Sequence, residues 1–294
     1  MNRRSFLRTA TVATTALAGL SWKRTLAAER VNWPIGCFNR AWSKWSYDDA
    51  LDGIKAAGYQ LTALLTGQRG DEAFTSSAAT PEYLDGLKQR ITRRGLVVNM
   101  TAIRFKPDAA LAENIADLRK QIENAARLEL KFMLTFGVDQ PAHYENFYRL
   151  MADAAALSEK RGIQVVLKPH GGGSGASEEI LRCLDKVAHA NFKIWYDAGN
   201  IVYYTGKDPL TELEPIAKHV TGFCAKDCPE PKGEVMSQFG TGKVDFKAVF
   251  VKLKNVGFNG PILVEGVKVG ATAEETTANA RANREFLEKV LRSI

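Results

Sequence analysis

The stretch IQVVLKPHGGGSGASEEILRCLDKVAHANFKIWYDAGN, residues 163–200, predicts a strand, a helix and a second strand. Residues 163–167 and 192–196 are short apolar runs typical of buried strands, and residues 178–187 place apolar side chains at helical spacing. Each strand ends in polar residues. Because ligand sites of parallel α/β folds lie at the carboxyl ends of the strands, Lys168, His170, Asp197 and Asn200 are the first candidates for chemistry.

The rest of the chain repeats this alternation. The expected strands are residues 31–38, 59–65, 96–101, 131–136, 163–167, 192–196, 220–225 and 259–264. The expected helices are residues 47–57, 81–94, 108–128, 143–161, 178–187, 209–214, 246–256 and 273–294. Ser46 and Thr80 are expected N-caps, and Gly58 and Gly95 are expected to end the first two helices. Strand and helix alternating over eight strands predict an α/β fold, a (β/α)8 TIM barrel with a single domain over residues 29–294, in preference to a doubly wound open sheet.

Residues 1–28 have the organisation of an export signal. Arg3 and Arg4 lie in the segment MNRRSFLR, an apolar run of small residues covers 9–20, and residues 26–28 offer small side chains for cleavage. The segment resembles a twin-arginine (Tat) signal, with a Sec signal or an uncleaved N-terminal anchor as alternatives. The apolar run is too short to span a bilayer, so no stable membrane anchor is expected. The resemblance implies the Tat export machinery as a partner and a periplasmic or otherwise exported protein.

Composition argues against nucleic-acid binding and against a disulfide framework. The chain has 40 Lys and Arg against 33 Asp and Glu, and five of the basic residues lie in residues 1–28, so 40 minus 5 leaves 35 basic residues against 33 acidic ones. This near-neutral balance gives no support for a nucleic-acid partner. An exported protein permits disulfides, but Cys37, Cys183, Cys224 and Cys228 are expected to be mostly buried thiols.

The residues that follow the strands of a barrel meet at one mouth. The polar candidates there are mixed in charge, which suits a small polyhydroxylated ligand such as a carbohydrate. They are Arg40, Arg104, Lys168, His170, Asp197, Asn200, Lys226, Asp227 and Glu265. Those expected to bind substrate are Arg40, Arg104, Asn200, Lys226 and Asp227.

Glu265 is the leading candidate for a general base, because a partly desolvated carboxylate at a strand end can have a raised pKa. The alternative is a carboxylate at the rim that pairs with Lys168, Lys226 or Lys268. The run Asp-Ala-Gly-Asn, residues 197–200, can orient a hydroxyl group and is also typical of a tight turn with an Asx cap. Both interpretations of this run can hold together.

Lys168 and His170 each have several possible roles. Lys168 could neutralise an enolate oxygen, form a Schiff base, or pair with Asp197 or Glu265. His170 could move protons near neutral pH, bind a metal, or bond only to the glycine-rich loop that follows it. The triglycine at 171–173 is a weak signal for an anion site, and no nucleotide cofactor is expected.

Several motifs together resemble the xylose isomerase-like TIM barrels, the sugar phosphate isomerase/epimerase family. They are Leu-Lys-Pro-His-Gly-Gly at 167–172, Tyr-Asp-Ala-Gly-Asn at 196–200, Ala-Lys-Asp at 225–227, Gly-Thr-Gly-Lys-Val-Asp-Phe at 240–246 and Val-Glu at 264–265. The resemblance covers essentially the whole mature chain. It implies an enzyme that exchanges protons at carbons beside a sugar carbonyl, with a divalent metal held by Glu, Asp, His and Glu from strands five to eight.

The chain departs from that family pattern at half of the implied metal ligands. Asp197 matches the family's Asp and Glu265 its last Glu, whereas Lys168 stands in place of the first Glu and Cys224 in place of the His. A charged lysine repels a divalent ion. Three outcomes stay open: Lys168 supplies the charge of the metal, a remodelled set of His170, Asp197 and Glu265 binds manganese, magnesium, cobalt or zinc, or the protein binds a sugar without turnover.

The residues and the resemblance together predict an exported sugar isomerase or epimerase-like enzyme. Its substrate is expected to be a free sugar, keto-sugar or glycoside, since sugar phosphates are mainly cytoplasmic. Glu265 is the predicted base, with Lys168 and His170 as electrophilic or acid partners. The alternatives are a non-catalytic carbohydrate-binding protein and a lyase or hydrolase of oxidised glycosides, while the charge balance disfavours an abasic-DNA endonuclease. The resemblance also allows a homo-oligomer.

Overall fold

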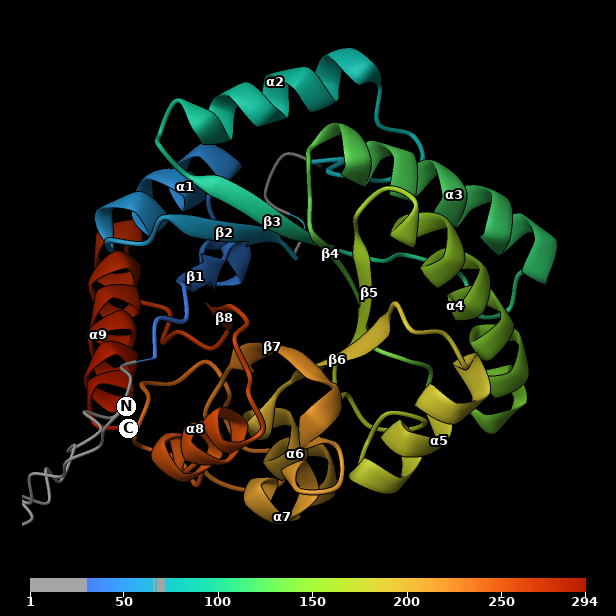
Figure 1. Ribbon diagram of the computed structural model, residues 1–294. Coiled ribbons are helices and arrows are strands. Elements are labelled where there is room, and N and C mark those ends of the chain that lie inside the picture. The colour runs from blue at the N-terminus through green and yellow to red at the C-terminus, as the bar shows by residue number, and fades with distance from the viewer. Residues whose placement is uncertain (1–30, 66, 68–71) are drawn as a thin grey trace, which may run out of the picture.

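Parallel strands close into a barrel at the centre of the protein (Figure 1). The computed structural model describes residues 31–65, 67 and 72–294. The strands follow one another around the barrel in chain order. They are β1 (Ile35–Phe38), β2 (Leu61–Leu64), β3 (Val97–Ala102), β4 (Phe132–Thr135), β5 (Gln164–Leu167), β6 (Phe192–Tyr196), β7 (Val220–Ala225) and β8 (Ile262–Val264). The predicted TIM barrel is confirmed, and the open sheet is excluded because β8 pairs back onto β1.

Helices form a ring around this barrel (Figure 1). The α-helices are α1 (Tyr47–Ala56), α2 (Pro81–Thr92), α3 (Leu111–Arg127), α4 (Tyr144–Glu159), α5 (Ser177–Val187), α6 (Ala198–Thr205), α7 (Pro209–Leu213), α8 (Phe246–Asn255) and α9 (Ala273–Arg292). Short 3-10 helices are η1 (Asn39–Trp42), η2 (Pro141–His143) and η3 (Ala217–His219). The predicted helices lie within a few residues of the observed ones. Helix α6 is the exception, because it occupies residues for which only a turn was expected.

The predicted caps begin the first two of these helices. The side chain of Ser46 accepts a hydrogen bond from the backbone N–H of Asp49, whose own side chain accepts from the backbone N–H of Ser46. The side chain of Thr80 accepts a hydrogen bond from the backbone N–H of Tyr83 and so caps α2, ahead of Pro81 in the first turn. After α1, Gly58 adopts a positive φ of 92°, which only glycine tolerates easily.

The apolar core has two layers. Side chains that point into the barrel, among them Met100, Val166, Trp195 and Leu263, form the inner layer. A larger cluster lies between the strands and the helix ring. Gly222 of β7 makes room for Trp195, because a Cβ atom at that position would lie 2.0 Å from the indole ring. The filled interior means that a ligand can enter only at an end of the barrel.

Two further features of the described residues concern the cysteines and the lengths of the helices. Cys37, Cys183, Cys224 and Cys228 are free and buried, as expected. No helix among the described residues is long and apolar enough to cross a membrane. The proposed export signal, residues 1–28, lies outside the described residues.

Candidate active site

Five charged side chains meet at the carboxyl end of the barrel, and we call them the ion network. They are Arg40 in η1, directly after β1, and Lys168, Asp197, Lys226 and Glu265, which follow β5, β6, β7 and β8. Four of them are buried, whereas the side chain of Arg40 is 32% exposed. Residues from distant parts of the sequence come within hydrogen-bonding distance because parallel strand ends converge at the mouth of a barrel.

Glu265 is the centre of the ion network. Its Oε1 atom accepts a hydrogen bond from Arg40 Nη1 at 2.6 Å and lies 2.9 Å from Lys226 Nζ, while its Oε2 atom accepts from Lys168 Nζ. Burial alone would raise the pKa of this carboxyl, but the charges of Lys168, Lys226 and Arg40 outweigh it and hold the pKa well below 4.5. The carboxylate is therefore ionised. The pairing with Lys168 and Lys226 that the alternative predicted is present, but at a buried position rather than at the rim.

Asp197 connects the ion network to α6. Its Oδ1 atom accepts a hydrogen bond from the backbone N–H of Asn200 at 2.9 Å, so Asp197 is the N-cap of this helix. Its Oδ2 atom lies 3.4 Å from Lys168 Nζ and 3.2 Å from Lys226 Nζ. This buried oxygen has two cations near it but accepts no well-aligned hydrogen bond from the described residues. Asp197 Oδ2 therefore contacts the ion network through ion pairs.

The two lysines of the ion network differ in their surroundings. Lys226 Nζ donates to Asn200 Oδ1 at 2.9 Å as well as contacting both carboxylates. Lys168 Nζ contacts the same carboxylates and lies 5.1 Å from the centroid of the Phe136 ring. Burial would lower the pKa of Lys168, but Glu265 and then Asp197 raise it above 10.5. The pairing expected for Lys168 is present with both carboxylates, and a protonated amine is not free to form a Schiff base.

His170 lies beside the ion network rather than in it. Its Nε2 atom is 2.9 Å from the hydroxyl of Tyr204, and its ring packs against Phe136 at a centroid distance of 5.0 Å. Burial, followed by the charges of Lys168 and Lys226, lowers the pKa of His170 to about 4, so the imidazole is neutral at pH 7. His170 also lines a cavity of about 330 Å³ between the loops after β3, β4 and β5. Sequence reasoning missed Tyr204 because it missed α6.

Three of the residues expected to bind substrate have other partners. Asn200 donates from Nδ2 to the carbonyl of Pro169 at 2.6 Å, so its amide is held on both sides. Asp227 was expected at the substrate, but its buried carboxylate accepts hydrogen bonds from the backbone N–H groups of residues 228, 240, 242 and 244. Asp227 therefore organises its own loop. Arg104 donates to the carbonyl of Leu65 and lies outside the ion network.

The donor groups of this site do not suit a divalent metal. Within residues 31–65, 67 and 72–294, no three His, Cys, Asp or Glu side chains are grouped so that they could hold an ion. The remodelled set of His170, Asp197 and Glu265 is therefore not assembled, because the ammonium of Lys168 lies between the two carboxylates. Cys224, beside Lys168, stays a thiol because burial raises its pKa well above 9.0.

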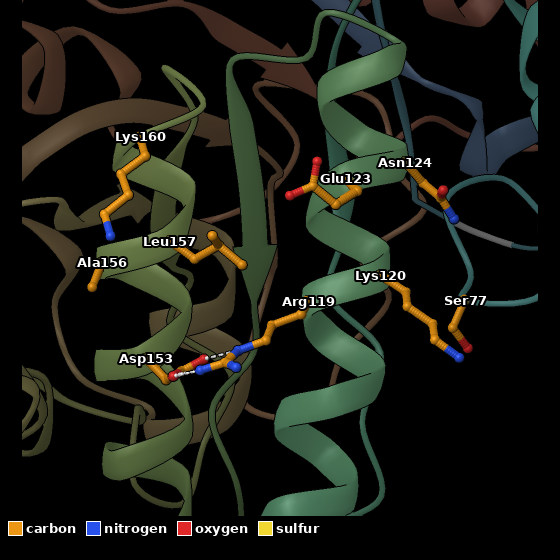
Figure 2. A pocket seen from close by; sticks show the side chains of 9 residues that line it. All are labelled: Ser77, Arg119, Lys120, Glu123, Asn124, Asp153, Ala156, Leu157 and Lys160. Carbon is orange, nitrogen blue, oxygen red and sulfur yellow. Dashed lines mark hydrogen bonds and ion pairs between the residues drawn. The ribbon is translucent and has the colours of Figure 1, made fainter.

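A larger groove lies away from this site, on the flank of the barrel. It has a volume of about 650 Å³ between α3 and α4, and Figure 2 shows the paired side chains of Arg119 and Asp153 spanning it. No residue of the ion network lines it. The strand ends, rather than this groove, bring together the groups that can do chemistry.

Comparisons with known proteins identify the family. The family model for the xylose isomerase-like TIM barrel matches residues 51–290. Inosose dehydratase from Clostridium beijerinckii is 26% identical over 166 residues, which cover 49% of this chain and 55% of that protein. L-ribulose-5-phosphate 3-epimerase UlaE from Salmonella paratyphi C is 26% identical over 193 residues, covering 61% of this chain and 64% of that protein. The chain thus spans between half and two thirds of the length of these curated relatives.

The solved structures agree with the fold. A xylose isomerase-like TIM barrel protein from Mycobacterium smegmatis, in complex with magnesium, superposes with a TM-score of 0.70 at 15% identity, covering 89% of this chain and 97% of that chain. At this identity the likeness shows the architecture alone.

Proposed function

The chain belongs to the xylose isomerase-like TIM barrel family, and from this premise we propose that it is a sugar isomerase or epimerase-like enzyme. It removes a proton from a carbon beside the carbonyl group of a small polyhydroxylated substrate. The observation that supports this proposal is the buried ion network at the strand ends, in which an ammonium group and a carboxylate touch. The ammonium group can stabilise an oxyanion while the carboxylate accepts the proton.

The charge of the ion network suits an enolate. The cations of Arg40, Lys168 and Lys226 face the carboxylates of Asp197 and Glu265, which leaves a surplus of one positive charge. When a C–H bond beside a carbonyl breaks, its electron pair moves toward the carbonyl oxygen, which becomes negative. Fixed positive charge in a buried site stabilises that oxygen more than it does in water.

Glu265 is the proposed base, and the ion pairs set its strength. In the free protein the low pKa of Glu265 makes the carboxylate a weak base. A substrate oxygen that draws Lys168 Nζ toward itself weakens one of these pairs and raises the basicity of Oε2. The proton then moves from carbon to Oε2. Its return to the former carbonyl carbon completes an isomerisation once the proton of the hydroxyl on the first carbon has moved to the former carbonyl oxygen. The neutral His170, held by Tyr204, is placed to exchange a hydrogen bond with a substrate hydroxyl.

The dehydratase among the relatives favours a second candidate, β-elimination. The same base would remove the same proton, and a hydroxyl group on the next carbon would then leave as water. A third possibility, sugar binding without turnover, is favoured by the tight pairing of Glu265 in the free protein. The three candidates share a substrate class and differ in what happens to the proton.

Deuterium exchange separates the candidates. The mature protein is incubated in D2O with free ketoses, keto-glycosides, inososes and L-ribulose 5-phosphate, and exchange beside the carbonyl is followed by NMR. We expect exchange with a free sugar or glycoside, loss of exchange in Glu265→Gln, and no change in Glu274→Gln, whose side chain is exposed. Loss of water, detected as an enol or the 1,2-diketone that it forms, indicates elimination. Binding with no exchange contradicts catalysis, and neither binding nor exchange across the panel contradicts the substrate class.

We further propose that the protein is exported by the Tat pathway, on the strength of the Arg3-Arg4 pair and the apolar run after it. The test is the location of the full chain in a bacterial host with a Tat system. Replacing both arginines by lysine is expected to retain the protein in the cytoplasm. Equal export of the two forms would contradict the Tat assignment and favour a Sec signal.

A further inference from the structure

Two carboxylate oxygens converge on the side-chain nitrogen of Lys168. Glu265 Oε2 hydrogen-bonds to Nζ, and Asp197 Oδ2 lies 3.4 Å from it. Both carboxylates are buried, and Asp197 Oδ2 accepts no well-aligned hydrogen bond within the described part of the chain. Anionic oxygens from separate strands that face one buried point are what a hard divalent cation requires. In this protein an ammonium is at that point.

Lys168, rather than Lys226, is the group at that point. Lys226 Nζ donates to Asn200 Oδ1 at 2.9 Å and lies 2.9 Å from Glu265 Oε1 and 3.2 Å from Asp197 Oδ2, so it is also bonded to the amide of α6. Lys226 is therefore tied to the wall of the site. Lys168 Nζ has the two carboxylates on one side and the face of the Phe136 ring on the other. Removing its ammonium would leave the carboxylates facing a space without a charge.

We infer that Lys168 takes the place of a divalent cation, so that the native site is independent of metal and a carboxylate at position 168 alone converts it into a metal site. The inference deepens the proposed function, because it names the group that faces the enolate oxygen. Its test does not depend on turnover, however, because metal binding is measured directly.

The net charge of the ion network supports the conversion of this site into a metal site by Lys168→Glu. The native network has three cations and two carboxylates, a surplus of one positive charge. Lys168→Glu leaves two cations and three carboxylates, a surplus of one negative charge in a buried site. A bound divalent ion would restore the native value of one positive charge. Lys168→Met leaves two of each, so it removes the ammonium without creating a demand for a cation or adding a ligand.

Ligand chemistry indicates which ions to use. The introduced carboxylate, Asp197 and Glu265 would supply oxygen ligands, which suit magnesium and manganese. The thiol of Cys224 is kept protonated by burial and adds no soft ligand. We therefore expect Lys168→Glu to bind manganese or magnesium in preference to ions that favour sulfur.

The experiment compares the native mature protein, Lys168→Glu and Lys168→Met, all purified without chelators or nickel columns. Metal content is measured by inductively coupled plasma mass spectrometry, and thermal midpoints are measured with manganese, magnesium, cobalt and zinc and after EDTA. We expect stoichiometric manganese and an EDTA-sensitive rise in the thermal midpoint for Lys168→Glu only. Lys168→Asp, which places the same charge on a shorter side chain, replaces Lys168→Glu if that variant does not fold, and it too is expected to bind manganese.

Either of two results overturns the inference: stoichiometric metal in the native protein that EDTA removes with a loss of stability, or a folded variant with an oxygen ligand at position 168 that binds no metal. The proposed function fails separately. If no substrate shows deuterium exchange but Lys168→Glu binds manganese, the site has the inferred geometry and the protein does not catalyse proton transfer on that panel.

Discussion

Glu265→Gln is expected to destabilise the protein more than Lys168→Met does, because the two changes move the buried charge in opposite directions. Glu265→Gln leaves three cations facing Asp197 alone, whereas Lys168→Met leaves two cations facing two carboxylates. Removing one partner of a buried ion pair costs about 3–5 kcal/mol, since the remaining charge stays buried without compensation. We expect Glu265→Gln to fall in that range and Lys168→Met below it.

The double variant tests whether this difference comes from charge. Glu265→Gln with Lys168→Met leaves two cations and one carboxylate, which restores the native surplus of one positive charge. Its cost should therefore be smaller than the sum of the two single costs, by about 0.5–3 kcal/mol for residues in direct contact. The contact between Lys168 Nζ and Glu265 Oε2 places this pair in that class.

The assay is urea-induced unfolding of the protein at neutral pH, followed by circular dichroism and tryptophan fluorescence. Free energies are compared only among variants that share the native m value. Glu274→Gln, an exposed glutamate in α9, is the matched control and should stay within about 0.5 kcal/mol of the native protein. Additive costs in the double variant, or a Glu265→Gln cost no larger than that of the control, would refute the reasoning.

Three further predictions concern pH, a loop and the packing of glycines. Stability should fall as pH drops from 6.5 toward 4, because folding lowers the pKa of His170 and the unfolded chain therefore binds more protons. In urea titrations, His170→Gln should remove the pH dependence that comes from this residue. Glu265, whose pKa is lowered by folding, should contribute to the free energy of unfolding above pH 4.5, and this contribution should be lost below that pH. Asp227→Ala should cost at least about 3 kcal/mol, because a charged acceptor loses several hydrogen bonds. As a control, Asp245→Ala, which removes the N-cap of α8, should cost about 1 kcal/mol. Limited proteolysis should cut the loop of residues 226–244 first in Asp227→Ala but not in Asp245→Ala. Gly222→Ala should lower the thermal midpoint through a clash costing about 1–3 kcal/mol, whereas Gly86→Ala, in open space on α2, should raise it by an effect of about 0.5–1 kcal/mol.

The barrel was predictable because its elements are short, regular and separated by strong local signals. Alternation of apolar runs with helical periodicity located all eight strands, and Ser46 and Thr80 marked the first two helix starts. The first strand begins at Ile35 rather than at residue 31, because pairing with β2 and β8 sets where a strand begins. The apolar pattern alone does not contain that information.

Helix α6 was missed because its sequence has weak helix propensity. Glycine, asparagine, β-branched and aromatic residues fill most of Ala198–Thr205, and the run that precedes them is typical of a turn. Tertiary contacts decide the outcome. Asp197 caps the helix, and a Cβ atom on Gly199 would lie 2.7 Å from the carbonyl oxygen of Lys226, so the chain can pack here only with glycine.

The expectation that residues after the strands meet at the mouth of the barrel predicted the members of the ion network, but it did not predict the direction of every side chain. Lys226 and Asp227 are neighbours at the end of β7, yet one points into the ion network and the other into its own loop. Successive side chains of an extended segment point to opposite sides, so an error of one residue in the strand end exchanges their roles. Arg104 lies two residues beyond the end of β3, and from there it reaches the carbonyl of Leu65 instead.

The ion pairs that hold the site together also make Glu265 a weak base, so Glu265 can accept a proton only when one of these pairs is weakened. With three cations in contact, the carboxylate has a low pKa and takes a proton from carbon poorly. A substrate whose oxygen replaces Glu265 as the partner of Lys168 does two things at once, because it gains the ammonium for its own developing charge and makes Oε2 more basic. A molecule that binds without reaching Lys168 leaves the base inactive. Under the proposed function, a sugar lacking the carbonyl oxygen should therefore bind without exchange, and selectivity should lie in the exchange rate rather than in affinity.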